Sequence, residues 1–320
     1  MTAGRDGEAT IGIIIPLYNG ARHITETLRS VLTQTHTALQ VIVLDDGSSD
    51  DSAEIVRTML DDPRLALVQK SNEGIARTRN AGLALLGADV AYVVFMDHDD
   101  LVAPDLYERL LRVLRRRPDA VGAYAIADWI DANSAPLGEG EFARFMRERQ
   151  AVRGGRVVPL APDVDATLPE LFLANHLYPP SGILLRREAV DAIGGFDPSY
   201  RVADDWDALV RLSRRGPIVP LDEILVGYRR HGANASGNAA LNVRESRAVW
   251  ARTYYSADNS TADRQALRAA WRGMQRHKFR IKSAVARREL RARRVGVALR
   301  CQLDALAHLA LVRPLRRWGR

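Results

Sequence analysis

The chain has 320 residues, of which 47% are hydrophobic, 27% charged and 6% aromatic. This composition supports a full hydrophobic core and excludes a largely disordered chain, and no apolar run reaches the ~20 residues that a membrane-spanning helix needs. The one cysteine, Cys301, excludes an internal disulfide and favours a reducing, cytoplasmic compartment. The polar residues 1–10 are predicted to be a disordered terminus without a signal peptide.

The net charge of +7 is divided unevenly along the chain. Residues 241–320 hold 20 basic and 5 acidic side chains, a net of +15, so the preceding 240 residues carry a net of −8. A basic segment on an acidic body predicts a separate anionic partner for that segment, either an anionic membrane surface or a nucleic acid.

Short apolar runs alternate with helical patterns over the first 130 residues. The predicted strands are 11–17, 39–44, 64–68, 90–96 and 121–126. The predicted helices are 21–34, 48–60, 74–86 and 104–116, with Ser48 or Ser49 as the N-cap of the second. This alternation predicts an α/β fold with a mostly parallel, Rossmann-like sheet and helices on both faces.

The second half of the chain is less regular. Residues 132–169 show no helical or strand period and are predicted to be loop. Predicted helices follow at 168–175, 187–193 and 204–215, and predicted strands at 182–185 and 224–228. From about residue 240 the chain is predicted to form arginine-rich helices.

Polar residues follow each of the first four predicted strands. Because the carboxyl ends of parallel strands meet at one edge of a sheet, these residues are predicted to line one ligand-binding crevice. They include Tyr18, Asn19, Asp45, Asp46, Asn72, Arg79, Asp97 and Asp99. The alternative is that each cluster is an ordinary turn or helix cap.

The crevice residues suit a metal-bound diphosphate. Asp97 and Asp99 are two residues apart at a strand end, so in extended geometry their carboxylates share a face and could bind Mg²⁺ or Mn²⁺. Arg79 could present its planar fork to phosphate oxygens. A phosphate loop, a glycine-rich dinucleotide loop after the first strand and a Cys/His zinc cluster are all absent from the sequence.

Six segments, in this order and spacing, resemble the inverting family 2 glycosyltransferases, which have the GT-A fold. The segments are IIIPLYNG (13–20), VLDDGSSDDS (43–52), SNEGIARTRNAGL (71–83), FMDHDDLVAPD (95–105), GGFDPSYRVADDWDALVRL (194–212) and LVGYRRHGANAS (225–236). The resemblance implies a GT-A domain over about 11–236, with a nucleotide-sugar half at 11–130 and an acceptor half at 131–236. An arginine-rich helical extension would then occupy 237–320.

The resemblance also implies roles for single residues. Asp46, with Asp45 beside it, would bind the nucleotide base, and Arg79 would lie near the diphosphate. Asp205 would be the catalytic base, and Asp204 stands where the family usually has Glu. The remaining implied nucleotide-sugar contacts are Pro16, Tyr18, Asn19, Asn72 and Asp97, and the implied metal contacts are Asp97, Asp99 and His231.

The activity that the resemblance implies is a hexosyltransferase-like one. One sugar would move from a nucleoside-diphosphate sugar, most simply a UDP-sugar, to a hydroxyl of a glycan or lipid-linked acceptor. The anomeric centre would invert and Mn²⁺ or Mg²⁺ would assist, in cell-surface glycan or polysaccharide biosynthesis.

Two functions other than glycosyl transfer are alternatives for this sequence. A sugar-nucleotide nucleotidyltransferase would usually carry a basic glycine-rich loop where this chain has Tyr18 to Ala21. A nucleic-acid-binding protein could use the basic segment, but no recognition motif or interleaved aromatic platform is present there, so no specific nucleic acid is expected.

The basic extension carries an apolar stripe between Val295 and Val312, with arginines on both sides and Trp318 after it. Such a helix is typical of one lying in a membrane interface, so we expect peripheral docking on the inner face of the membrane. The alternative is that the stripe packs on the catalytic domain or on a second subunit, which leaves the oligomeric state open.

Overall fold

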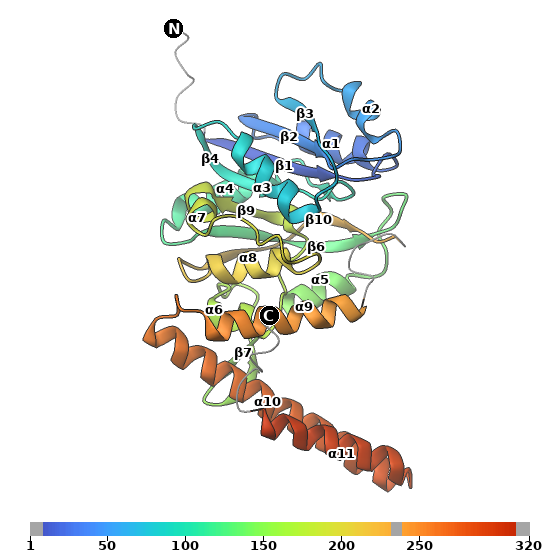
Figure 1. The fold of residues 1–320 in the computed structure, drawn as a ribbon, viewed down its shortest axis with the longest axis vertical. Helices are drawn as coiled ribbons and strands as arrows, with labels where there is room; N and C mark the ends of the chain where they lie inside the picture. Colours follow the sequence, from blue (N-terminus) through green and yellow to red (C-terminus); the bar gives the residue numbers. More distant parts are fainter. Residues whose placement is uncertain (1–8, 232–238, 312–320) are drawn as a thin grey trace.

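An eight-stranded mixed sheet forms the body of the protein in a computed structural model, which describes residues 9–231 and 239–311 (Figure 1). The strand order is β3-β2-β1-β4-β9-β6-β10-β5. The strands are β1 (Thr10–Leu17), β2 (Leu39–Asp45), β3 (Leu65–Gln69), β4 (Val90–Phe95), β5 (Leu101–Val102), β6 (Gly122–Ile130), β9 (Ile183–Arg186) and β10 (Ile218–Arg229). Of the predicted disordered terminus, residues 1–8 lie outside the described residues.

The sheet is mostly parallel, as the sequence predicts. Strands β3, β2, β1 and β4 run parallel to one another, and β6 runs parallel to β10. Strand β9 is antiparallel to both of its neighbours, β4 and β6, and the short β5 is antiparallel to β10. The run of buried isoleucines in β1 reflects a parallel strand whose two faces are both covered by helices.

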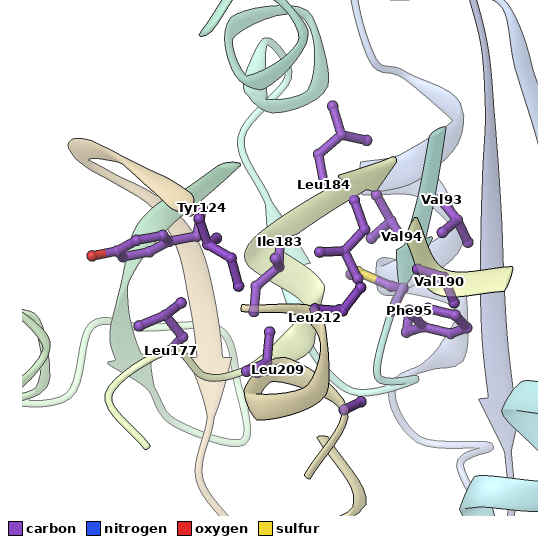
Figure 2. Packing of buried hydrophobic residues seen from close by; sticks show 14 of the residues in the cluster. Val93, Val94, Phe95, Tyr124, Leu177, Ile183, Leu184, Val190, Leu209 and Leu212 are labelled. Atoms are coloured by element: carbon purple, nitrogen blue, oxygen red, sulfur yellow. The ribbon is translucent and has the colours of Figure 1, made fainter. Parts of the chain in front are cut away.

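Helices cover the sheet on both faces. They are α1 (Ile24–Leu32), α2 (Ser52–Arg57), α3 (Ile75–Leu85), α4 (Leu106–Arg116), α7 (Arg187–Ala192) and α8 (Asp204–Leu212). Side chains of β4, β9 and α8 meet in one buried core, among them Phe95, Ile183 and Leu209 (Figure 2). This packing places the first turn of α8 next to the central strands of the sheet.

The helix predicted at residues 48–60 is shorter in the structure at both ends, where it forms α2. It begins at Ser52 rather than Ser48, and its N-cap is Asp51 without a side-chain cap. The reason is that Asp50 accepts hydrogen bonds from the backbone and hydroxyl of Ser52, while the Ser48 hydroxyl is used by the loop after β1. These local side-chain bonds hold residues 46–51 as a loop.

Residues 132–169 contain regular structure that the sequence does not predict. They form α5 (Glu141–Arg147), the hairpin β7 (Gln150–Arg153) and β8 (Arg156–Pro159), and the first residues of α6 (Leu168–Leu173). Helix α5 has only seven residues, which is too short to show a period. The Gly154-Gly155 pair indicates the hairpin in the sequence, because both residues adopt the positive φ that a two-residue hairpin turn needs.

Within residues 239–311, the C-terminal extension forms three helices, α9 (Ala239–Tyr255), α10 (Thr261–Arg291) and α11 (Val295–Ala310). Helix α9 packs into the body: the Trp250 indole N–H donates to the carbonyl of Phe172, and its ring meets Trp206 edge-on. Packing therefore continues across the expected domain boundary near residue 236. Residues 312–320, which include Trp318, lie outside the described residues.

Helix α10 begins with a capping box between Ser260 and Asp263. Its first half packs on the body through Trp271 and Gly273, which approaches Val152 of β7. Its second half pairs with α11 and projects from the body as a helical hairpin (Figure 1). No helix within the described ranges is long and apolar enough to cross a bilayer.

Candidate active site

The loops after β1, β2 and β3 meet at one edge of the sheet. The backbone N–H of Asn19 donates to the Ser48 hydroxyl at 2.9 Å. The backbone N–H of Ser49 donates to the side-chain oxygen of Asn19 at 2.8 Å. Asn19 has a φ of +51°, a conformation that asparagine tolerates better than most residues. The structure thus brings the first two predicted clusters into direct contact.

Asp46 ties the loop after β2 to the loop after β3. Its buried carboxylate accepts hydrogen bonds from Lys70 at 2.5 Å and from the backbone N–H groups of Glu73 and Gly74, each at 2.9 Å. Burial raises the pKa of Asp46, but these donors outweigh it and the net shift is downward. Three of about four lone-pair positions are thereby used, so at most one is left for a ligand.

The other residues expected to hold the nucleotide lie around Asp46. Asp45 is buried and accepts from Ser48 N–H and from Gln69. Pro16 is buried in β1, whereas Tyr18 is 50% exposed and Asn72 is exposed. Tyr18 and Asn72 are therefore the accessible members of this group. Lys70, which the sequence analysis did not select, belongs to the same cluster.

The sequence analysis assigns the Arg79 fork to phosphate oxygens, but in the structure two carboxylates occupy it. Its guanidinium is buried and bonds two carboxylates, Asp204 at 2.7 Å and Asp97 at 2.9 Å. Burial would lower the pKa of Arg79, but the charges of Asp204 and Asp97 raise it. The sequence could not reveal this because Asp204 is 125 positions away. One side chain thus links the end of β4 to the start of α8.

Asp97 and Asp99 lie directly after β4 and differ in surroundings. Burial raises the pKa of Asp97. The positive charge of Arg79 opposes this effect, but the net shift is upward. Burial also acts to raise the pKa of Asp99, but the hydrogen bond to His231 outweighs it and the pKa is lowered. His231 Nε2 lies 2.8 Å from Asp99 Oδ2, so the structure brings together two of the three residues expected to contact a metal.

A divalent cation such as Mg²⁺ or Mn²⁺ binds mainly to hard oxygen ligands. Among residues 9–231 and 239–311, no group of three or more His, Cys, Asp or Glu side chains is placed to hold a metal ion. A cation that arrives with a diphosphate needs only one or two protein carboxylates, and Asp99 supplies a hard oxygen ligand of the kind that Mg²⁺ and Mn²⁺ prefer. The residues present fit such a shared site.

Three buried residues that the sequence analysis missed support this edge. The Ser181 hydroxyl donates to Asp100 at 2.6 Å and accepts from the backbone N–H of Asp97 at 3.0 Å. Arg229 is fully buried and donates to the carbonyl of Asp99 at 2.7 Å. The backbone of the β4 loop is therefore fixed from the short 3-10 turn Pro180–Gly182, just before β9, and from β10, both of which are far away in sequence.

Asp204 and Asp205 open α8 but have different roles in the structure. Asp204 is buried against Arg79, whereas Asp205 is half-buried and borders a small apolar hollow beside Pro180 and Phe196. Burial, and then the charge of Asp204, raise the pKa of Asp205 to about 7. A carboxylate with a pKa near neutrality is suited to accept a proton.

Glu245 of α9 holds the segment that leads into α8. Its carboxylate accepts hydrogen bonds from the backbone N–H groups of Arg201, Val202 and Ala203 at 2.9 to 3.2 Å. These N–H groups belong to the N-cap Ala203 and to the two loop residues before it, and a buried carboxylate satisfies them. The extension therefore contributes to the position of Asp205.

Comparisons with known proteins identify the family. Residues 12–194 match the family model described as glycosyl transferase family 2. An uncharacterized glycosyltransferase of Nostoc sp. is 29% identical over 241 residues, which are 74% of this chain and 70% of that protein. Chondroitin synthase of Escherichia coli is 26% identical over 228 residues, 71% of this chain but only 30% of that enzyme.

Solved structures share the GT-A fold. Staphylococcus aureus TarS 1–349 in complex with UDP-GlcNAc has a TM-score of 0.64 at 20% identity and covers 84% of this chain and 72% of its own. The mannosyltransferase PcManGT of Pyrobaculum calidifontis, in complex with GDP-Man and Mn²⁺, has a TM-score of 0.58 at 19% identity. That match covers 98% of this chain and 84% of the mannosyltransferase.

Proposed function

Because this chain belongs to glycosyl transferase family 2 and is a nucleotide-sugar-dependent glycosyltransferase, we propose that it transfers one sugar to an acceptor hydroxyl with inversion, using Asp205 as the general base. The observation that carries this proposal is the half-buried Asp205 carboxylate, with its pKa raised to about 7. It stands at the start of α8, one residue from the Asp204–Arg79–Asp97 bridge to the donor-side loops.

The proposed step is a single displacement. The acceptor oxygen forms a bond to the anomeric carbon while its proton passes to a carboxylate oxygen of Asp205. The bond from the anomeric carbon to the diphosphate oxygen breaks, and the nucleoside diphosphate leaves with the electron pair. Attack opposite the leaving group inverts the anomeric centre.

The donor would occupy the edge formed by the loops after β1 to β4. Tyr18, Asn19 and Asn72 would contact base and ribose at the accessible rim, over the buried Pro16, Asp45 and Asp46. Asp99, with Asp97 and His231 beside it, would hold Mn²⁺ or Mg²⁺, whose charge would stabilise the departing diphosphate. Arg79 would position Asp97 and Asp204 rather than bind phosphate.

UDP-sugars are the first donors to test, because one structural neighbour was solved with UDP-GlcNAc, with GDP-mannose next. The proposed acceptor is a glycan or lipid-linked hydroxyl in cell-surface glycan or polysaccharide synthesis. The proposed location is cytoplasmic, peripheral to the inner face of the membrane. The nucleotidyltransferase and nucleic-acid alternatives gain no support from the family match.

The test is nucleotide release by the full chain from a panel of UDP-, GDP- and dTDP-sugars with Mn²⁺ or Mg²⁺. One donor should release nucleotide above background, and Asp205→Asn should reduce that release. Asp61→Asn, a change at an exposed carboxylate, is the matched control. A panel that gives no release, or equal release by Asp205→Asn, would argue against the proposed chemistry.

A further inference from the structure

The turn of the α10–α11 hairpin gathers exposed apolar and basic side chains far from the catalytic body. We define residues 287–299, the end of α10, the turn and the start of α11, as the hairpin tip. Four large apolar residues of the tip are about half exposed or more: Leu290 at 57%, Val295 at 54%, Val297 at 49% and Leu299 at 61%.

Helix α11 uses other residues to pack on α10. Its buried positions are the small Ala298 and Ala305, which allow close approach of the two helices. The larger Leu303 and Leu306 continue the outward stripe at 67% and 49% exposure. Among the described residues, this exposed part of the stripe does not pack on the catalytic domain, whereas Leu311 at its end packs against the main hydrophobic core.

The tip is also strongly basic. Within 287–294 there are five arginines and one acidic residue, Glu289, a net charge of +4. Glu289 is buried and paired with Arg294 at 2.8 Å, whereas all five arginines are exposed. Residues 261–310 as a whole hold 13 basic and 3 acidic side chains, a net of +10.

The turn itself places an arginine where the backbone favours glycine. Arg293 has a φ of +59°, its N–H bonds Leu290 O at 3.0 Å, and Arg294 N–H bonds Glu289 O at 2.9 Å. This is the hydrogen-bond pattern that usually ends a helix with a left-handed glycine. The chain thus keeps a charged residue at a strained position at the outermost point of the hairpin.

We propose that the hairpin tip docks the enzyme on an anionic lipid bilayer. Arginines would pair with lipid phosphates while Leu290, Val295 and Leu299 enter the boundary between headgroups and acyl chains, the combination that interfacial segments use. A nucleic acid would neutralise the arginines but leave the apolar side chains in water. A second copy would bring two +4 tips together, which charge repulsion disfavours.

The test is co-sedimentation of the full chain with vesicles of phosphatidylglycerol and phosphatidylcholine, compared with vesicles of phosphatidylcholine alone. Binding should require the anionic lipid and weaken as salt is raised. A triple variant, Arg287→Gln, Arg291→Gln and Arg293→Gln, should bind about a hundredfold more weakly, at about fivefold for each basic residue.

A second triple variant separates the apolar contribution. Leu290→Ser, Val295→Ser and Leu299→Ser should also lose most binding, whereas Leu60→Ser and Leu85→Ser, exposed leucines of the body, should not. Nucleotide release by every variant should match the unmodified chain, because the tip contacts no site residue. This readout also separates failure of docking from failure of the proposed chemistry.

Outcomes of three kinds would overturn the proposal. One is absence of vesicle binding at low salt, and another is binding that both triple variants retain. The third is binding to duplex or single-stranded DNA that survives the serine variant, or a dimer in sedimentation that the serine variant abolishes without vesicle binding. Those results would assign the tip to a nucleic acid or to a second copy.

Discussion

The Glu245 carboxylate accepts a 3.1 Å hydrogen bond from the backbone N–H of Ala203, the residue immediately before α8. The same carboxylate holds the two preceding N–H groups, so three consecutive donors converge on one buried side chain. Asp204 and Asp205 follow directly. A helix from the C-terminal extension therefore holds the residues at which α8 begins.

Glu245→Gln should slow turnover while leaving donor affinity unchanged. Oε2 of the carboxylate accepts from all three N–H groups, and an uncharged amide oxygen would hold them more weakly, because hydrogen bonds to a charged group contribute about 1.5–3 kcal/mol. Steady-state kinetics should show a lower kcat at similar donor KM, with partial recovery in Glu245→Asp. Glu188→Gln, at an exposed residue, is the control. A fall in thermal stability with no change in kcat would reduce Glu245 to a purely structural role.

Asp205→Asn should lower turnover without loss of stability, whereas Asp204→Asn should lower stability more than turnover. Asp205→Asn is nearly isosteric and removes the base, so turnover should fall about 10²-fold or more at an unchanged melting temperature. Asp204→Asn weakens the pair with Arg79, so the melting temperature should fall while turnover is partly retained. The reverse pattern would place the base one residue earlier.

The pH dependence of kcat/KM should follow Asp205. Its pKa of about 7 lies above the usual value for aspartate, so the proton-accepting form is depleted below neutrality. The profile should rise about tenfold per pH unit up to about pH 7 and then level. Asp204→Asn removes the neighbouring negative charge and should move this limb to lower pH. If the acidic limb of the profile stays at the same pH in Asp204→Asn, a group other than Asp205 titrates.

Arg79→Met should destabilise the fold. It leaves the buried Asp204 without its cation and Asp97 with less compensation, a change that costs about 3 kcal/mol or more. Chemical denaturation should show this loss, and the double variant with Asp204→Asn should recover part of it. An unchanged free energy of unfolding in Arg79→Met would mean that the bridge is not formed in solution.

Asp99→Asn should remove the Mn²⁺-dependent part of UDP binding measured by calorimetry. Its carboxylate is the hard oxygen donor nearest to His231, and an amide is a weaker ligand. Asp163→Asn, at an exposed loop position, should bind like the unmodified chain. Equal Mn²⁺-dependent affinity in the two variants would remove Asp99 from the metal site.

The sequence predicts strands β1 to β4 well, because each is an apolar run followed by polar residues, but it does not predict the two-residue strand β5. It does not predict the antiparallel insertion of β9, whose partners β4 and β6 lie far from it along the chain. The same limit applies to the site. Asp46 contacts the loop after the next strand, 24 to 28 positions away, which the strand pattern places at the same sheet edge. Arg79–Asp204 and Glu245–Ala203 depend on tertiary packing that no residue pattern encodes.

The length of α10 gives the hairpin a further property. Thirteen residues of this helix, 279–291, follow Lys278, whose ammonium lies over the Trp250 ring, and at 1.5 Å per residue they span about 20 Å. A rigid spacer of this length would keep the crevice away from any surface that the tip touches. Sugars attached directly to a headgroup would then be out of reach, and the enzyme would select acceptors by how far their chains extend into the water.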